Sequence, residues 1–151
     1  MQIIYYSYWS TYAAYLAAAL HTGSYRGKSP SKGQIDRQWN LCKRYSQQFG
    51  NLLYIGLDDR HREVYALGCK RQEDMAKFAL EGFVRIFTET EAVHLVKAGP
   101  LEGPIPFLIE GFYRFSKRKR ILRLAFHFWM KRTYKKCKEL VFNTRQDLDG
   151  E

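Results

Sequence analysis

Residues 2–23, QIIYYSYWSTYAAYLAAALHTG, decide the fold of this chain. The stretch opens on Gln2–Tyr8, which is rich in β-branched and aromatic residues and too short for a helix, so it predicts a buried strand. The run that follows begins at Ser10, contains five alanines and ends at Gly23, which predicts a helix. A strand, a short loop and a helix in this order indicate a layered α/β domain.

The middle of the chain alternates between the periodicities of helix and strand. Residues 51–56 and 63–68 read as strands on either side of the turn LDDRHR, a pattern that predicts a β-hairpin. Residues 92–96 predict a further strand. Helical spacing predicts two helices. The first, over residues 34–48, places on one face Ile35, Trp39, Cys42 and Tyr45. The second, over residues 72–88, places on one face Met75, Phe78, Ala79, Phe83 and Phe87.

The last third of the chain holds a short helix over residues 107–115 and then the stretch ILRLAFHFW, residues 121–129. In that stretch Leu122, Leu124, Phe126 and Phe128 alternate with other residues, and a period of two predicts a strand. Lys131–Val141 predicts a closing helix. The expected fold is one α/β domain over residues 1–146, with helices on both faces of a mostly parallel sheet of about five strands that includes one β-hairpin, and a disordered acidic tail over residues 147–151.

Composition excludes several classes of protein. A chain of 151 residues is long enough for one domain with a core of its own. Its cysteines, Cys42, Cys69 and Cys137, are too few and too widely spaced for a disulfide framework or a zinc site, and its four histidines have no metal-ligand spacing. No apolar run is long enough to cross a membrane. We therefore expect a cytoplasmic protein without metal or cofactor, while its oligomeric state stays open.

Positive charge gathers in one segment. Of the net charge of +10, eleven lysines and arginines and no acid fall between Arg114 and Lys138. Aromatic residues are interleaved with these cations, and the combination is typical of nucleic-acid or anionic-surface binding. The alternative is that the aromatics belong to the core and the cations are solvated. The residues expected to bind nucleic acid in the first case are Lys117, Arg118, Lys119, Arg120, Lys131 and Arg132.

The loop after the first strand predicts an anion site. Free backbone N–H groups at a helix N-terminus favour an anion, and the hydroxyls of Ser7, Ser10 and Thr11 add donors. Lys70 and Arg71 follow another strand and are expected at the same sheet edge, where they would clamp a phosphate-bearing small molecule. Alternatively, Ser10 or Thr11 caps the helix and Trp9 fills the pocket, since the loop lacks the glycines and lysine of a phosphate-binding loop.

A second candidate for chemistry is the acidic turn. Asp58 and Asp59, with His61 nearby, supply groups for acid–base catalysis. Aspartate is also favoured in turns because it hydrogen-bonds to neighbouring backbone, and the hairpin explains the pair better.

Three stretches resemble a family of spore-forming Firmicutes, the domain of unknown function thirty-one eighty-nine. Residues 3–23 are similar to its opening YHCYGGTHSSVVAAAIHLG, residues 56–71 to its G-x-D-E-x-G-x-x-V-Y-x-L-G-R-R element, and residues 109–122 to its I-G-G-F-L-S-R-R-L-G-L element. The resemblance implies a cytoplasmic, sporulation-associated protein and supplies no reaction. Positions that coincide with the family are His21, Gly68, Arg71, Ser116 and Arg118.

The chain departs from that family in the first loop. Trp9-Ser10 stands where the family has two glycines, and Tyr12-Ala13-Ala14 stands where it has a histidine and two serines. This implies reduced or absent catalysis. We therefore expect a protein that binds a phosphate-bearing small molecule at the first loop, or alternatively a polyanion at residues 114–138.

Overall fold

The computed structural model describes residues 1–87 and 92–150, apart from the side chains of residues 83, 84, 86 and 87. The strands are β1 (Gln2–Ser7), β2 (Leu52–Leu57), β3 (Glu63–Gly68) and β4 (Val93–Lys97). The helices are α1 (Ala13–His21), α2 (Lys32–Tyr45), α3 (Glu73–Phe87), α4 (Ile105–Tyr113) and α5 (Lys119–Gly150), with a 3₁₀ turn, η1 (Gly99–Leu101), before α4.

The four strands form one mixed sheet in the order β2-β3-β1-β4. β1 pairs in parallel with both β3 and β4, so the prediction that the first strand lies inside the sheet is confirmed. β2 and β3 pair antiparallel, which confirms the predicted hairpin. The expectation of about five mostly parallel strands needs correction, because one strand fewer is present among the described residues and one of the three pairings is antiparallel.

The predicted strand at residues 121–129 is wrong, because this stretch belongs to the long helix α5. Its buried side chains are Leu122, Phe126 and Trp129, whose spacing of four and three is helical. Leu124 and Phe128, which the alternating pattern assigned to the same buried face, are 69% and 60% exposed. The expected closing helix at residues 131–141 is a part of α5 as well.

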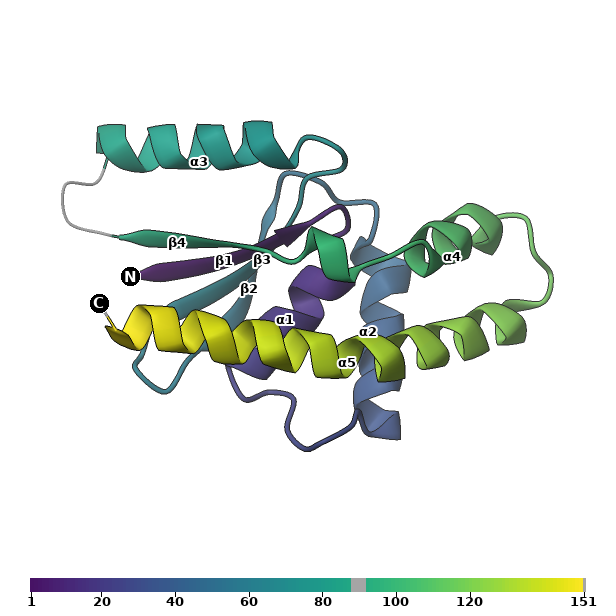
Figure 1. Cartoon of the computed structure of the whole chain (residues 1–151). Helices are drawn as coiled ribbons and strands as arrows, with labels where there is room; N and C mark the ends of the chain where they lie inside the picture. Colours follow the sequence, from purple (N-terminus) through teal and green to yellow (C-terminus); the bar gives the residue numbers. More distant parts are fainter. Residues whose placement is uncertain (88–91, 151) are drawn as a thin grey trace.

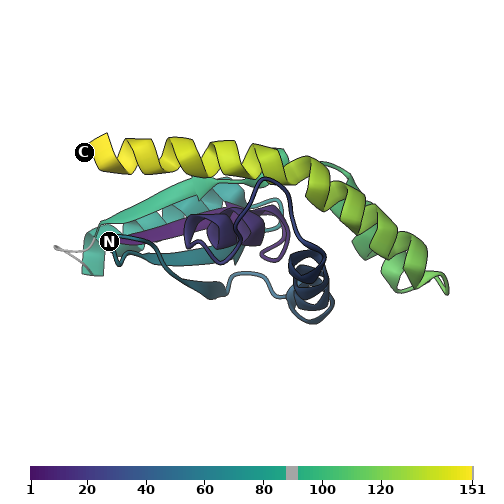
Figure 2. The same cartoon turned by 90° about the horizontal axis from the view of Figure 1, so that it is seen from below.

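Helices cover both faces of the sheet (Figure 1). Ile4 and Tyr6 of β1 point to the face that α3 covers, together with Ala76 and Leu80 of that helix. Ile3 and Tyr5 point to the opposite face, where α1 and α5 complete the main core. Figure 2 shows α5 along one side of the molecule, with the sheet, α1 and α2 all on the same side of it.

Two predicted features of the periphery differ in the structure. On α3 the exposed side includes Met75 (68%) and Phe78 (81%), so the predicted apolar face is not core there, and the side chains of Phe83 and Phe87 lie outside the described residues. The chain is helical through Gly150 where a disordered tail was expected. Leu148 explains this extension, because its side chain is buried against the main core.

Candidate functional site

The loop between β1 and α1 is sealed inside the protein. Ser7, Ser10 and Thr11 are all buried, with exposed fractions of 3% or less. Ser7 donates its hydroxyl to the carbonyl of Trp9 at 2.6 Å. The residue before the first turn of α1 is Tyr12, without a side-chain cap, so Ser10 and Thr11 do not cap the helix.

Gly68 of β3 packs directly against this loop. A Cβ atom at Gly68 would lie 2.7 Å from the backbone nitrogen of Ser10, which is closer than van der Waals contact allows. The backbone of β3 continues along the loop, since the N–H of Cys69 donates to the carbonyl of Ser7. A side chain at position 68 would therefore force the loop away from the sheet.

A buried carboxylate occupies the N-terminus of α1. Oε1 of Glu102, a residue 3% exposed just after η1, accepts from the N–H of Trp9 at 3.1 Å, and its Oε2 accepts from the N–H of Ala13 at 3.3 Å. Burial raises the pKa of Glu102 to about 7, against the opposing pull of these donors. The chain thus supplies its own carboxyl group to the amides where an external anion was expected.

The cations predicted for this site follow β3 at the same sheet edge, where the N–H of Lys70 donates to the carbonyl of Tyr8 at 3.1 Å. Their side chains, however, are in solvent. Lys70 and Arg71 are exposed, and the ammonium of Lys70 lies 4.7 Å from the centre of the Phe49 ring. Trp9 is buried and packs against Tyr8, Phe49 and Phe107. The three hydroxyl residues therefore lie in a buried loop that Glu102 binds through backbone amides, while the side chains of the predicted cations face solvent.

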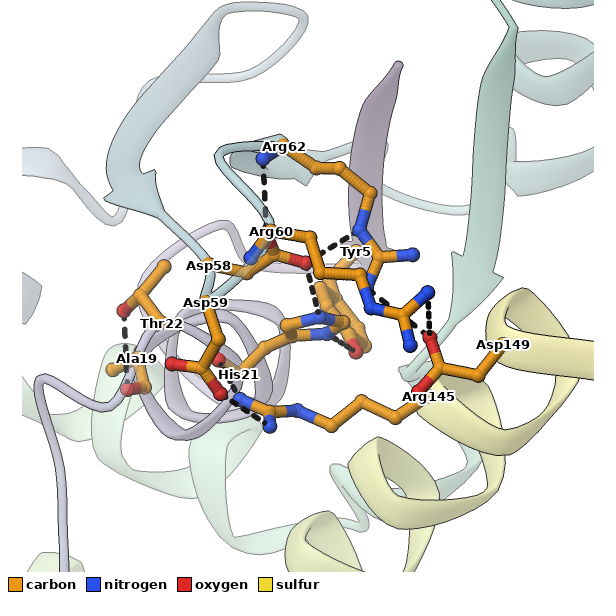
Figure 3. A network of polar contacts seen from close by, with 10 residues as sticks. All are labelled: Tyr5, Ala19, His21, Thr22, Asp58, Asp59, Arg60, Arg62, Arg145 and Asp149. Carbon is orange, nitrogen blue, oxygen red and sulfur yellow. Dashed lines mark hydrogen bonds and ion pairs between the residues drawn. The ribbon is translucent and has the colours of Figure 1, made fainter.

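At the other end of α1, His21 lies in a buried polar cluster (Figure 3). Its Nδ1 is 2.6 Å from the hydroxyl of Tyr5, and its Nε2 is 3.4 Å from Oδ2 of Asp58. Burial lowers the pKa of His21 to about 4, with the nearby Arg145 acting in the same direction. Because His21 is 0% exposed, the ring ties elements of the fold together and cannot touch a substrate in this conformation.

The acidic turn is a structural element. Oδ1 of Asp58 accepts from the N–H groups of Arg60 and Arg62 at 2.9 Å each, which closes the turn between β2 and β3. Oδ2 of Asp58 pairs with the guanidinium of Arg62 at 2.6 Å. Asp59 pairs with Arg145 of α5 (Figure 3), and His61 is exposed at the turn with a φ of 60°. The geometry agrees with the turn interpretation.

The basic segment, by contrast, is open to solvent. All eleven of its lysines and arginines are exposed. Among the described residues only one of them, Arg123, forms an ion pair with an acid, Asp36. Lys119 lies 4.9 Å above the ring of Tyr113, and Lys138 donates to the carbonyl of Gly27. Ten cations therefore have no acidic partner in the part of the chain that the structure describes.

The interleaved aromatic residues divide between the core and the surface. Phe126 and Trp129 are in the core, at 0% and 2% exposed. Phe112, Phe115 and Phe128 are exposed by 57%, 86% and 60%. The aliphatic side chains of Leu108, Ile121 and Leu124 are also more than half exposed.

Within residues 1–87 and 92–150, no three histidines, cysteines, aspartates or glutamates come together as metal ligands. The three cysteines are buried thiols, and burial raises the pKa of Cys69 to about 11 and that of Cys137 to about 12. Over the same residues, none of the helices combines the length and the apolar character needed to span a bilayer.

The protein is an α/β domain with helices on both faces of a mixed sheet. The N-terminus of α1 binds the side chain of Glu102, and the first half of α5 exposes many lysines and arginines to solvent. A sequence model of the family described as Protein of unknown function (DUF3189) matches residues 2–146, and the chain belongs to that family. No curated protein and no solved structure matches the chain significantly.

Sequence reasoning missed Glu102. The residue lies in a loop of glycines and prolines, AGPLEGPIP, and its partners Trp9 and Ala13 precede it by 93 and 89 positions. No local pattern marks such a contact, because it forms only when η1 is brought beside the first loop. The general expectation of an anion at this N-terminus was the available signal.

Proposed function

We propose that this chain is an interaction protein with reduced or no catalysis, which binds a polyanionic partner through residues 114–138. The observation that carries the proposal is the set of ten exposed cations without an acidic partner among the described residues. Cations that stabilise a fold are usually paired with an acid, and among the described residues Arg123 is the only member of this segment that is. Unpaired, clustered cations instead attract phosphate groups and gain free energy by releasing counterions.

The position of these cations in α5 supports the same proposal. Lys119 and Arg120 occupy the first turn of the helix, where the helix dipole disfavours positive charge. No acid accompanies them in that turn. An arrangement that costs stability is expected where charge serves binding.

The test compares two variants with the same change in net charge. Lys117→Gln/Arg118→Gln/Arg120→Gln removes three exposed cations from the segment, and Lys32→Gln/Arg37→Gln/Arg44→Gln removes three exposed cations from α2. Binding to anionic phospholipid vesicles and to a labelled single-stranded oligonucleotide is measured at about 50 mM salt, where non-specific polyanion binding is strong. The first variant is expected to bind about a hundredfold more weakly, at about 1 kcal/mol for each cation.

The control variant on α2 is expected to retain most of the affinity, and parent binding should weaken steeply with salt. Equal losses in both variants would show that only net charge matters and would contradict the assignment to residues 114–138. An absence of binding to both polyanions at micromolar protein would reject the proposal.

A phosphate-bearing small molecule at the first loop is the second candidate. Its support is that the α1 N-terminus accommodates an anion, the carboxylate of Glu102. An external phosphate reaches the same amides only by displacing that carboxylate, so Glu102→Ala is expected to bind phosphate more tightly than the parent. Calorimetric titration with inorganic phosphate, nucleotides and sugar phosphates measures this, with Arg71→Ala as the variant for the proposed clamp. Absence of binding to both parent and Glu102→Ala would reject this site.

A further inference from the structure

The first half of α5 carries an exposed apolar stripe, which we define as Ile121, Leu124 and Phe128. These residues follow one another at intervals of three and four positions and so share one helix face. They are 55%, 69% and 60% exposed. Their neighbours Leu122 and Phe126 are buried in the core, so the apolar stripe points away from the domain.

The surroundings of the apolar stripe are basic. Lys131 and Lys135 continue the same face at the next helical intervals, and both are exposed. Arg120 and Arg132 lie beside the stripe, also exposed. Phe115, in the turn before α5, adds a side chain that is 86% exposed among further cations.

α3 provides an internal comparison for this surface. Met75 and Phe78, three positions apart, are exposed by 68% and 81%, so each is at least about as exposed as the residues of the apolar stripe. Their helix carries three acids and two bases, EDMAKFALEGFVRIF, so it has no basic excess. Apolar exposure alone therefore does not set the apolar stripe apart. Its combination with unpaired positive charge does.

We infer that the α5 face formed by Ile121, Leu124 and Phe128 inserts into the surface of an anionic lipid bilayer, with the flanking lysines and arginines on the lipid phosphates. This inference rests on the proposed function and names its partner. Membrane-surface helices combine an apolar face with flanking cations, and their affinity grows with buried apolar area and with anionic lipid.

A lipid surface fits these residues better than a nucleic acid does. Exposed phenylalanines would suit base stacking as well as insertion, but Ile121 and Leu124 have no ring to stack. Branched aliphatic side chains gain free energy when they leave water for acyl chains. The three side chains of the apolar stripe are more than half exposed, while Leu122 and Phe126 face the core, so a flat surface has access to this face.

The test measures co-sedimentation with vesicles of phosphatidylcholine alone and of phosphatidylcholine mixed with phosphatidylglycerol. The variants are Leu124→Ser/Phe128→Ser in the apolar stripe and the matched control Met75→Ser/Phe78→Ser on α3. We expect the parent to bind the anionic vesicles and not the neutral ones. The stripe variant is expected to bind at least about tenfold more weakly, since each buried Leu or Phe side chain contributes an appreciable transfer free energy, and the control is expected to bind like the parent.

The remaining outcomes separate this inference from the proposed function. Unchanged vesicle binding by the stripe variant, together with loss in the Lys117/Arg118/Arg120 variant, would overturn insertion and leave polyanion binding standing. Binding to the oligonucleotide but not to vesicles would overturn it in favour of nucleic acid. A parent dimer that the stripe variant dissociates, measured by sedimentation equilibrium without lipid, would overturn it by making the stripe a contact between copies. Failure to bind either polyanion would overturn both proposals.

Discussion

Two regions of this protein are built to receive negative charge, and the fold treats them in opposite ways. At the N-terminus of α1 the backbone amides of Trp9 and Ala13 receive the carboxylate of Glu102 in the interior. Along residues 114–138, ten exposed lysines and arginines form no ion pair with an acid among the described residues. Buried backbone amides that are hydrogen-bonded internally contribute to stability, while exposed charges that are left unpaired are available to a partner. The comparison therefore predicts where substitutions affect folding and where they affect binding.

The largest expected effect separates two phenylalanines of α5. Phe126→Ala should lower the free energy of unfolding by about 3–5 kcal/mol, because it opens a cavity in the core. Phe128→Ala should change it by less than about 0.5 kcal/mol, because that side chain is largely solvated. Urea unfolding of both variants measures the difference. Similar losses would indicate that the two side chains share a buried face, as in a strand, and would contradict the helical assignment.

That pair also shows what sequence could and could not predict. β1 and the β2-β3 hairpin were predictable because their patterns are local and unambiguous. In residues 121–129 the set Leu122, Leu124, Phe126 and Phe128 fits a strand, while Leu122, Phe126 and Trp129 fit a helix. An exposed apolar stripe adds apolar positions that the core does not need, and so it hides the helical period.

The candidate sites were predictable to different degrees for a related reason. The basic segment is continuous in sequence, and all of its cations are exposed as the charge pattern predicted. At the first loop, the expected partners Lys70 and Arg71 are on the surface, and the residue that binds the amides is Glu102. Contacts between residues about ninety positions apart, such as those of Glu102 with Trp9 and Ala13, depend on packing and leave no periodic trace.

Stability should depend on pH in opposite directions at the two ends of α1, where Glu102 lies at the N-terminus and His21 at the C-terminus. The pKa of Glu102 rises from 4.5 to about 7 on folding, so the stability it contributes falls as pH increases across that range. The pKa of His21 falls from 6.5 to about 4, so its contribution falls as pH decreases across that range. Each shift corresponds to about 3 kcal/mol, and the two oppose each other between pH 4.5 and 6.5.

We therefore expect the free energy of unfolding of the parent to change little over that interval. Glu102→Gln should gain stability steadily as pH rises, because the raised pKa of Glu102 no longer offsets the lowered pKa of His21. Urea unfolding at a series of pH values measures both slopes. Glu139→Gln, on the exposed side of α5, is the control and should behave as the parent. Identical profiles for Glu102→Gln and the parent would show that the pKa of Glu102 is not raised in this range.

Glu102→Ala tests directly how much the buried loop between β1 and α1 depends on Glu102. It leaves the buried N–H groups of Trp9 and Ala13 without an acceptor, and we expect a loss of about 2 kcal/mol in unfolding free energy near neutral pH. Glu139→Ala removes a solvated carboxylate and should change stability by less than about 0.5 kcal/mol. Thermal unfolding measures both, and equal values would contradict a stabilising role for the hydrogen bonds of the Glu102 side chain.

The smallest change in unfolding free energy is expected for substitutions in residues 114–138, and there it should be a gain in stability. The Lys117→Gln/Arg118→Gln/Arg120→Gln variant removes cations from and just before the first turn of α5, where they repel one another and oppose the helix dipole. It should therefore be more stable than the parent by about 0.3–1 kcal/mol at low ionic strength, even as it loses polyanion binding. Because the charges are exposed, this gain should disappear near 1 M salt, where the Debye length is about 3 Å. Urea unfolding at low and high salt measures it, with the Lys32/Arg37/Arg44 variant as the charge-matched control.

A loss of stability in the Lys117/Arg118/Arg120 variant would mean that these cations stabilise the fold. The contrast between this segment and the N-terminus of α1 would then be wrong. A salt-sensitive gain combined with lost binding would show that charge in this segment is kept at the expense of the fold, which is the behaviour expected of a binding surface.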